Sequence, residues 1–477
     1  MKYLLQKAGS IPVMEGNVTK EQPFASGTGN SQYFRIPAML TLSDGTIVVA
    51  ADARYETTED GGGLDTIGAI SEDGGKTWNY NFPIHFPDSK GYASTLATTV
   101  IDPVLAKGSD GTLYCVADVN PTGVTTYYLY KFPGKGTGYI KIDGIDRLAL
   151  TSDYENVNIQ PVEEDNTVYE YYVGDFNEFG YAPILNRIDN TVTEYGVDEW
   201  YNLYTVKDGE YIADLTQKQV NTEEIIQQNA FYKDSILHVY NTGYMWMVSS
   251  KDNGKTWGRP VILNPQIKRE EETGLLVSPG KGTLTSKGDI LIPFYNHKEG
   301  KEFASFIYSS DNAKTWKRTN DVLNMASSES ELVELYDGTI RMFYRNYTGK
   351  ICYADAIKDE NGEYTFGKGK AIEVSVESTC NVTALAYSHS LNEKQVIIVG
   401  CPTGVGRTNG KLFVFIVEEE NELVLIDTYE VSNSSDGYCY SCIDELSDGS
   451  IALLWEPSHS AIEYRVCTLE CLKNTIK

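Results

Sequence analysis

Residues 71–78 read Ser71-Glu72-Asp73-Gly74-Gly75-Lys76-Thr77-Trp78, and the same eight-residue pattern returns twice. The second copy covers residues 250–257 and the third residues 309–316, where Ala313 replaces the usual glycine. An aspartate can accept hydrogen bonds from backbone N–H groups of its own turn, and a tryptophan can cover the end of a hairpin. This repeated turn, an Asp-box, therefore predicts a series of β-hairpins built in the same way.

A second repeated turn alternates with the first along the chain. It joins a polar pair, usually Asp-Gly, to an apolar run, and its copies begin at Asp44, Asp110, Lys287, Asp337 and Asp448. Glycine supplies the positive φ that such tight turns need. Many short runs alternate apolar and polar residues between these turns, and helical signals are sparse, which predicts an all-β fold. We expect a six-bladed β-propeller, although the repeats account for only about five units.

The segment from Ser152 to Asn229 breaks this rhythm. It is rich in Tyr, Asn, Asp and Glu and lacks the Asp-box, yet residues 167–173 have the composition of a strand. Because structureless loops of this length are rare, we expect a small inserted β domain at 152–229. The first part of the propeller then covers 1–151 and its remainder 230–477. The alternative is a long surface excursion of the propeller.

The charge of the chain excludes several partners. Lys and Arg number 40 and Asp and Glu 67, so the formal net charge is −27. Such a chain is repelled by nucleic acid and by anionic membrane surfaces, and an anionic substrate would need positive groups concentrated at its site. We expect no membrane span, since no stretch of 18 apolar residues occurs. Residues 1–24 lack the apolar core of a signal peptide.

Eight cysteines are few for a disulfide scaffold, and we interpret most of them as small buried apolar residues. Cys439 and Cys442 have the spacing of a redox motif, but no βαβ pattern surrounds them, and a zinc site would need two more ligands. The five histidines show no ligand spacing. We expect neither a metal site nor a cofactor.

A short motif near the start of the chain adds a family resemblance. Tyr33-Phe34-Arg35-Ile36-Pro37 precedes the first turn, and the three Asp-boxes follow it. In this order the motifs resemble those of the bacterial exo-sialidases, the family 33 glycoside hydrolases, over nearly the whole chain. The resemblance implies a monomeric enzyme, extracellular or at the cell surface, that needs no cofactor. It would remove terminal sialic acid from glycoproteins, glycolipids or oligosaccharides.

The resemblance implies three catalytic residues. Asp60 stands where the family has its general acid, Glu329 where it has a glutamate, and Tyr440 where it has its nucleophile. Sialic acid carries a carboxylate on its reacting carbon, so a neutral phenol avoids the repulsion that an attacking carboxylate would meet; sialidases are the known tyrosine exception among retaining glycosidases. A phenol with a pKa of about 10 needs a base within reach, and Glu329 is the candidate.

The resemblance also implies a set of substrate-binding residues. Arg35, Arg345 and Arg407 would hold the sugar carboxylate, which paired guanidinium donors match in geometry. Glu456 would orient Arg35 as its counter-charge. Arg54 stands where the family has a further arginine near O4 of the sugar. Asp102 either contacts the sugar near O4 or is simply a strand-end residue.

Neighbouring residues compete for several of these roles. Asp52, Glu59 and Asp65 compete with Asp60, Glu331 and Glu334 compete with Glu329, and Tyr438 competes with Tyr440. Period-two alternation places Glu329 and Glu331 on one strand face, so only the family spacing to Arg345 favours Glu329.

The leading functional prediction is a retaining exo-α-sialidase that acts through a tyrosyl intermediate. A relative that uses the same residues could instead release an anhydro-sialic acid or transfer the sialyl group to another glycan. A propeller that binds glycans without catalysis is a further alternative, against which the complete set of catalytic candidates argues.

Overall fold

The computed structural model describes residues 5–16, 22–87, 97–131, 134–165, 167–218, 224–377, 379–458 and 460–473. Strands dominate it, as predicted. Among these residues α-helix is confined to α1 (Thr126–Lys131) and α2 (Asn264–Ile267), and single 3₁₀ turns lie at Thr28–Asn30, Tyr154–Asn156, Glu419–Asn421 and Glu470–Leu472. None of the described helices is long and apolar enough to cross a bilayer.

The first sheet contains ten strands, among them the strands that carry Arg35 and Arg54. It comprises β1 (Gly9–Glu15), β2 (Tyr33–Thr41), β3 (Ile47–Arg54), β4 (Leu64–Ser71), β5 (Asn79–His85), β6 (Thr99–Lys107), β7 (Leu113–Asn120), β18 (Tyr244–Ser250), β19 (Val261–Ile262) and β21 (Gly280–Lys281). A parallel bridge between Leu64 and Thr99 joins the meander β2–β5 to the strands around β6.

Four further sheets follow in chain order. The first contains β20 (Gly274–Val277), β22 (Thr283–Leu284), β23 (Ile290–Lys298), β24 (Lys301–Ser309) and β25 (Lys317–Arg318), and the second β26 (Ser330–Glu334), β27 (Ile340–Tyr344), β28 (Lys350–Lys358), β29 (Tyr364–Phe366) and β30 (Lys370–Ser375). The third contains β31 (Thr383–Leu391), β32 (Lys394–Gly404), β33 (Thr408–Val417) and β34 (Leu423–Glu430), and the last β35 (Ser441–Glu445), β36 (Ile451–Ser458) and β37 (Ala461–Cys467).

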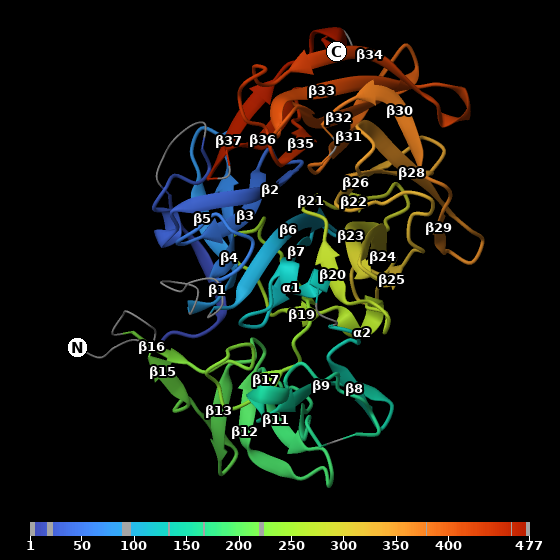
Figure 1. Ribbon diagram of the computed structural model, residues 1–477. Helices are drawn as coiled ribbons and strands as arrows, with labels where there is room; N and C mark the ends of the chain where they lie inside the picture. The colour runs from blue at the N-terminus through green and yellow to red at the C-terminus, as the bar shows by residue number, and fades with distance from the viewer. Residues whose placement is uncertain are drawn as a thin grey trace.

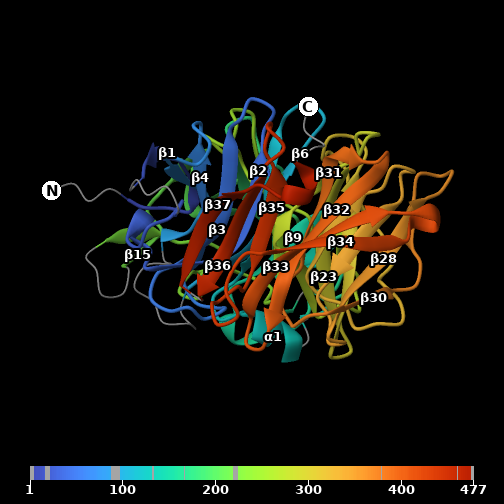
Figure 2. The ribbon, with the colours of Figure 1, turned by 90° about the horizontal axis from the view of Figure 1, so that it is seen from above.

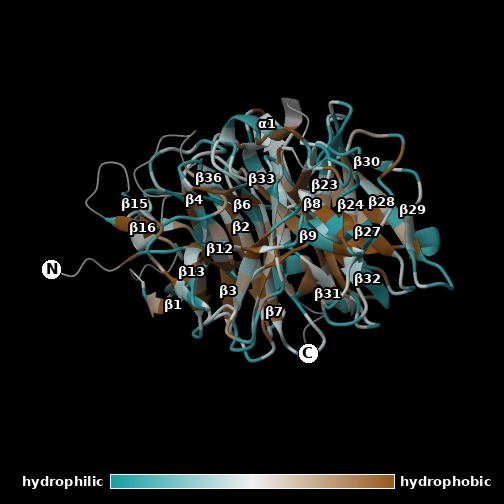
Figure 3. Ribbon diagram, turned by 90° about the horizontal axis from the view of Figure 1, so that it is seen from below, coloured by the Kyte–Doolittle hydropathy of each residue, from teal (hydrophilic) through white to brown (hydrophobic). Residues whose placement is uncertain are grey.

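These sheets are arranged like the blades of a propeller. Viewed from above, the red strands β35–β37 lie beside the blue strands β2 and β3, so the last sheet meets the first (Figure 2). Phe34 N donates to Ser460 O at 3.2 Å across this junction. Hydrophobic segments follow the strands inside the ring, whereas the connecting loops at its margin are largely hydrophilic (Figure 3). The all-β, propeller-like architecture is therefore confirmed.

The Asp-boxes form the turns that the sequence predicts. Asp73 Oδ1 accepts hydrogen bonds from the backbone N–H groups of Lys76 and Thr77, at 3.0 and 2.9 Å. Trp78 is buried and its ring meets Tyr464 of the last sheet edge-on, with centroids 5.3 Å apart. A β-carbon on Gly75 would lie 2.2 Å from the Tyr464 ring, which requires glycine there. This Asp-box thus helps to join the first sheet to the last.

A separate eight-stranded sheet lies below the propeller in Figure 1. It consists of β8 (Tyr139–Ile142), β9 (Ile145–Thr151), β10 (Tyr171–Val173), β11 (Tyr181–Asn186), β12 (Val192–Asp198), β13 (Leu203–Lys207), β14 (Glu210–Ile212) and β17 (His238–Val239), while β15 (Thr216–Lys218) pairs with β16 (Ile225–Gln227). The segment 152–229, predicted as an insertion, lies inside this range. The sheet shares a hydrophobic core with the propeller, since Tyr201 and Leu203 cluster with Phe86 and Trp246.

Candidate active site

Several of the predicted site residues lie at or beside the ends of strands that belong to different sheets. Arg35 lies in β2 and Arg54 ends β3, while Glu329 directly precedes β26 and Tyr440 directly precedes β35. Residues from sequence positions hundreds apart meet here because every sheet presents its inner strand to the same axis.

Tyr440 and Glu329 form the centre of the site. The Tyr440 hydroxyl donates a hydrogen bond to Glu329 Oε1, and both residues are buried. Arg345 Nη1 donates to Glu329 Oε2 at 2.8 Å and to the Tyr440 oxygen at 3.3 Å. Burial, and then the charge of Glu329, raise the pKa of Tyr440 well above its usual value. The phenol is therefore neutral at rest, and its proton can pass directly to the carboxylate.

The competing residues lie elsewhere. Glu331 Oε2 accepts from Ala384 N at 3.0 Å, and Glu334 accepts from the backbone and hydroxyl of Ser286. Tyr438 is fully buried in the core between β33 and the last sheet. Among these candidates the structure pairs Tyr440 with Glu329.

Three guanidinium groups surround the Tyr440 ring. The Arg35 and Arg407 guanidinium carbons lie 5.7 and 5.5 Å from its centroid, and Arg345 contacts its hydroxyl. Arg35 pairs with Glu456, as predicted, through Nε and Oε2 at 3.3 Å. Glu456 Oε1 also accepts from Ile36 N at 2.6 Å. The chain as a whole is strongly acidic, with a net charge of −27. Three guanidinium groups around one tyrosine therefore concentrate positive charge locally, which favours the binding of an anion there.

Of these three arginines, Arg407 has the fewest bonds from its guanidinium to the rest of the protein. In the described part of the chain it forms no ion pair, and its Nη2 donates to Thr379 O at 3.3 Å. Its backbone adopts a φ of 61°, a left-handed conformation that is rare outside glycine. A strained residue with an available cation fits the binding of a ligand carboxylate.

Asp60 lies on the loop between β3 and β4. Its Oδ1 accepts from Arg54 Nη1 at 2.8 Å and from Arg35 Nη1 at 3.1 Å. Although burial opposes it, the charges of Arg54 and Arg35 lower the pKa of this carboxyl. Asp60 is therefore ionised in the free protein. An acid function requires that its contact with Arg35 weaken when a ligand binds.

Arg54 has a structural role in this loop. Its side chain is fully buried, and Nη1 donates to the carbonyl oxygens of Thr58 and Glu59 as well as to Asp60. Nη2 donates to Asp52 Oδ2 at 2.7 Å. Arg54 thus anchors the acid loop to β3.

Asp102 is a buried residue within β6. It has a φ of 60°, and its N–H donates to Asp52 Oδ1 at 3.0 Å. Burial, and then the nearby Asp52, raise its pKa well above the usual range. Asp52, which sequence reasoning considered only as a rival acid, here links Arg54 to Asp102. Nothing in the sequence pattern distinguished that linking role.

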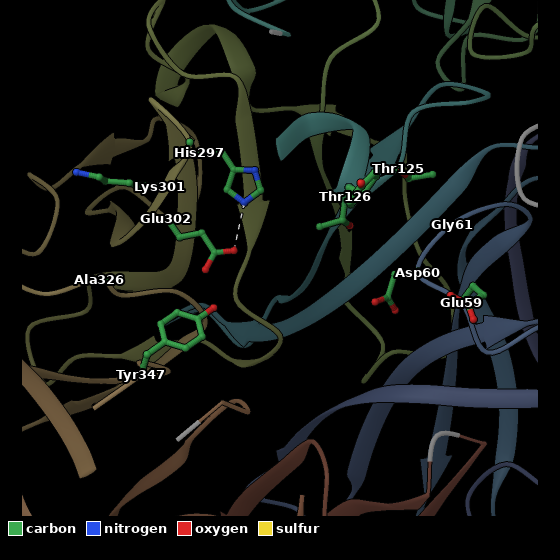
Figure 4. Close-up of a pocket in the computed structure, with 12 residues that line it drawn as sticks. Glu59, Asp60, Gly61, Thr125, Thr126, His297, Lys301, Glu302, Ala326 and Tyr347 are labelled. Atoms are coloured by element: carbon green, nitrogen blue, oxygen red, sulfur yellow. Dashed lines mark ion pairs between the residues drawn. The ribbon is translucent and has the colours of Figure 1, made fainter. Parts of the chain in front are cut away.

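A cleft of about 830 Å³ opens beside Asp60 (Figure 4). Glu59, Asp60 and Thr126 line one side, and His297, Glu302 and Tyr347 face them from the other. His297 Nε2 lies 3.5 Å from Glu302 Oε1. Sequence reasoning missed this wall, because no motif marks the hairpin between β23 and β24.

The cysteines form no disulfides, and two of them lie beside the catalytic candidate Tyr440. The eight cysteines all carry free thiols, and Cys380 and Cys439 pack against Tyr440 and Ile36. Within the described ranges no three His, Cys, Asp or Glu side chains form a cluster that could hold a metal ion.

The fold and the site together define a propeller-like protein in which three arginines surround a buried tyrosine. Residues 36–436 match the BNR repeat-like domain, and the chain belongs to that family. It is 29% identical to the anhydrosialidase of Macrobdella decora and 28% identical to sialidase B of Streptococcus pneumoniae. These matches cover 91% of the chain and 59% and 63% of the relatives, so the chain spans about three fifths of their length.

Two solved structures are similar to this chain as well. The intramolecular trans-sialidase from Ruminococcus gnavus superposes with a TM-score of 0.80 at 27% identity, covering 95% of this chain and 98% of that one. The leech intramolecular trans-sialidase superposes with a TM-score of 0.78, also at 27% identity, over 97% of this chain and 71% of that one. The resemblance to sialidases predicted from the sequence is confirmed.

Proposed function

We propose that this chain is a retaining exo-α-sialidase that releases terminal sialic acid from glycoproteins, glycolipids or oligosaccharides. The convergence of Arg35, Arg345 and Arg407 on Tyr440 carries the proposal. A sugar whose carboxylate binds these guanidinium groups has its adjacent anomeric carbon beside the Tyr440 oxygen. Few other substrates place a carboxylate on the reacting carbon itself.

The first step forms a tyrosyl-enzyme intermediate. The Tyr440 oxygen attacks the anomeric carbon while its proton passes to Glu329, and Asp60 gives its proton to the departing glycosidic oxygen. For this, the sugar carboxylate must take over Arg35, which frees Asp60 from one of its two cations. Desolvation by the sugar then raises the pKa of Asp60 and lets it carry a proton.

The second step releases the sugar. Asp60, now a carboxylate, takes a proton from water, whose oxygen attacks the anomeric carbon. The bond to Tyr440 breaks, and the phenolate recovers its proton from Glu329. Arg345 donates to both partners throughout and stabilises the charge that they exchange.

The cleft beside Asp60 supplies room for the departing glycan. A general acid stands between the retained and departing sugars, and the arginines mark the retained side. The departing sugars therefore occupy the opposite side, between Asp60 and the wall of His297 and Glu302 (Figure 4).

An intramolecular trans-sialidase is the second candidate. The similarity to the intramolecular trans-sialidase from Ruminococcus gnavus, which covers 95% of this chain, supports it. In that reaction a hydroxyl of the bound sugar, rather than water, attacks the anomeric carbon and leaves an anhydro sugar. Transfer to a second glycan uses the same intermediate.

Digestion of sialyl-lactose, followed by NMR of the products, tests the function and its variants. Free sialic acid supports hydrolysis, an anhydro sugar supports the intramolecular reaction, and a new sialylated glycan supports transfer. Tyr440→Phe removes the nucleophile and lowers kcat by at least about 10³-fold. Tyr438→Phe removes a buried hydroxyl two residues away and changes kcat by less than about threefold. Equal turnover by the two variants contradicts the proposed nucleophile, and an inactive wild type leaves a glycan-binding propeller as the function.

We also propose how the molecule is divided, how it is assembled and where it works. The ten-stranded sheet counts as two blades, one around β2–β5 and one around β6, β7, β18 and β19, which with the other four sheets makes six. Residues 152–229 act as an inserted domain within residues 1–151 and 230–477 of the propeller. The enzyme works as a monomer, outside the cell or at its surface, where sialylated glycans lie.

A further inference from the structure

A lysine ammonium lies buried beneath the site. Lys281 is 7% exposed and belongs to β21, whose two residues pair in parallel with Val104 and Leu105 of β6. Its Nζ donates to Ile443 O at 2.6 Å and to Asp444 Oδ1 at 3.2 Å. Removing an ammonium from water costs several kcal/mol unless partners offset the loss. The reaction proposed above makes no use of this charge.

The same ammonium interacts with a second inner strand. Although burial opposes it, the charges of Asp444 and of Glu331 in β26 raise the pKa of Lys281, so it stays protonated. Gly280, its neighbour, lies directly against the Glu331 carboxylate, because a β-carbon there would be 3.7 Å from Glu331 Oε2. Lys281 therefore stands between β26 and β35.

Further bonds tie β35 to two other inner strands at this level. Ile443 N donates to Thr383 Oγ1 of β31 at 3.1 Å, so the Ile443 residue is held through both its N–H and its carbonyl. Asp444 Oδ2 accepts from Thr41 N at 2.7 Å and from Thr41 Oγ1 at 2.9 Å. Thr41 ends β2, the strand that carries Arg35.

The two strands joined by Lys281 are those that present Glu329 and Tyr440. Glu329 directly precedes β26 and lies two residues before Glu331, on the same strand face. Tyr440 directly precedes β35 and lies three residues before Ile443. We propose that Lys281 is a positioning residue, a buried cationic clamp that sets the separation of the nucleophile and its base.

The clamp rests on the sialidase function proposed above, and it affects chemistry more than binding. Within the described ranges, Arg345, Arg407 and Arg35 bond to Glu329, Thr379 and Glu456 rather than to Lys281, so the carboxylate site keeps its donors when the ammonium is lost. The bond between Tyr440 and Glu329 loses its fixed length, and a displacement of about 1 Å can cost a hundredfold in rate.

Lys281→Met is tested against a matched variant, Lys268→Met. Lys268 is equally buried, at 6% exposure, but its Nζ donates to Gly134 O, Gly136 O and Thr242 Oγ1, remote from these strands. With sialyl-lactose, Lys281→Met lowers kcat at least about tenfold. KM and the inhibition constant of free sialic acid stay within about twofold, since uniform binding is retained. Lys268→Met loses thermal stability but keeps kcat.

The double variant Lys281→Met/Glu331→Gln covers the case in which Lys281→Met does not fold, because it also removes the charge of Glu331, the more deeply buried of the two carboxylates that Lys281 balances. It is expected to fold and to keep the low kcat, since the bond to Ile443 O is still missing. A wild-type kcat in the folded double variant overturns the clamp, as does an equal fall of kcat in the two single lysine variants. A wild type without turnover instead refutes the proposed function.

Discussion

Asp60 is held as a carboxylate by two cations, and this determines how its acidity must change during a reaction. Arg54 and Arg35 both donate to its Oδ1. Arg54 is locked by four acceptors and cannot leave, whereas Arg35 can turn to a substrate carboxylate. The acid function of Asp60 therefore depends on the substrate itself.

This coupling predicts two different pH profiles. An acid works only when protonated, so kcat/KM falls as pH rises through the lowered pKa of Asp60 in the free protein. In the complex the pKa is higher, so kcat falls at a higher pH. In rates with sialyl-lactose between about pH 4 and pH 8, kcat/KM is therefore expected to fall from the acid end of the range, whereas kcat falls only above the higher pKa of the complex. If kcat and kcat/KM fall at the same pH, the exchange of Arg35 between Asp60 and the substrate is contradicted. Asp65→Asn is not a suitable control for this experiment, because Asp65 pairs with His85.

At the same scale, the sequence predicted side-chain identities better than their partners. Family spacing selected Glu329 over Glu331, which periodicity could not separate. The contacts do separate them, since Glu329 accepts from the Tyr440 hydroxyl and Glu331 from Ala384 N. Arg54 is expected near the sugar, and the structure adds that its guanidinium also donates to the carbonyl groups of its own loop. Such differences depend on neighbours from other strands, which no local pattern encodes.

The Asp-boxes are the elements that the sequence predicted most completely, because all their bonds are local. In the third copy, Asp311 Oδ1 accepts from Thr315 N at 2.9 Å, and Oδ2 accepts from Thr315 Oγ1 at 2.6 Å. Ala313 takes the φ of 61° that glycine would normally supply. By contrast, β21 has two residues and no sequence signature, since its pairing with β6 is long-range.

Removing the carboxylate of this Asp-box weakens the hairpin without touching the site. Asp311→Ala lowers the free energy of unfolding by about 1–2 kcal/mol at pH 6, because the turn loses charge-assisted hydrogen bonds. Although burial opposes it, hydrogen bonds from Thr315 lower the pKa of Asp311 to about 2. A lowered pKa stabilises the fold above the unfolded value of about 4, and this contribution disappears as pH falls towards about 2.

Urea unfolding at pH 6 and at about pH 3 measures this dependence, with the exposed Lys314→Ala of the same turn as the control. The difference between wild type and Asp311→Ala is expected to shrink at the lower pH. A difference that grows on acidification contradicts the account, and so does a changed KM.

At the scale of the whole molecule, the insertion and the propeller share a core. The Phe231 ring lies 5.9 Å from Tyr201 of the insertion and 5.1 Å from Trp246 of β18, measured between centroids. Phe86, which follows β5, lies 6.5 Å away. The change of rhythm at Ser152 predicted a separate unit, but composition could not reveal a core built from aromatic residues on both sides.

The shared core predicts one cooperative unfolding transition for both parts. Phe231→Ala leaves a cavity where the two parts meet and lowers the free energy of unfolding by about 3–5 kcal/mol. Calorimetry is expected to show a single transition that moves to lower temperature as a whole, since neither part keeps its core alone. Phe179→Ala is the matched control, because that ring is 77% exposed on the insertion. Two transitions, of which only one shifts in Phe231→Ala, would mean that the insertion folds independently and that its aromatic contacts with the propeller add little to stability.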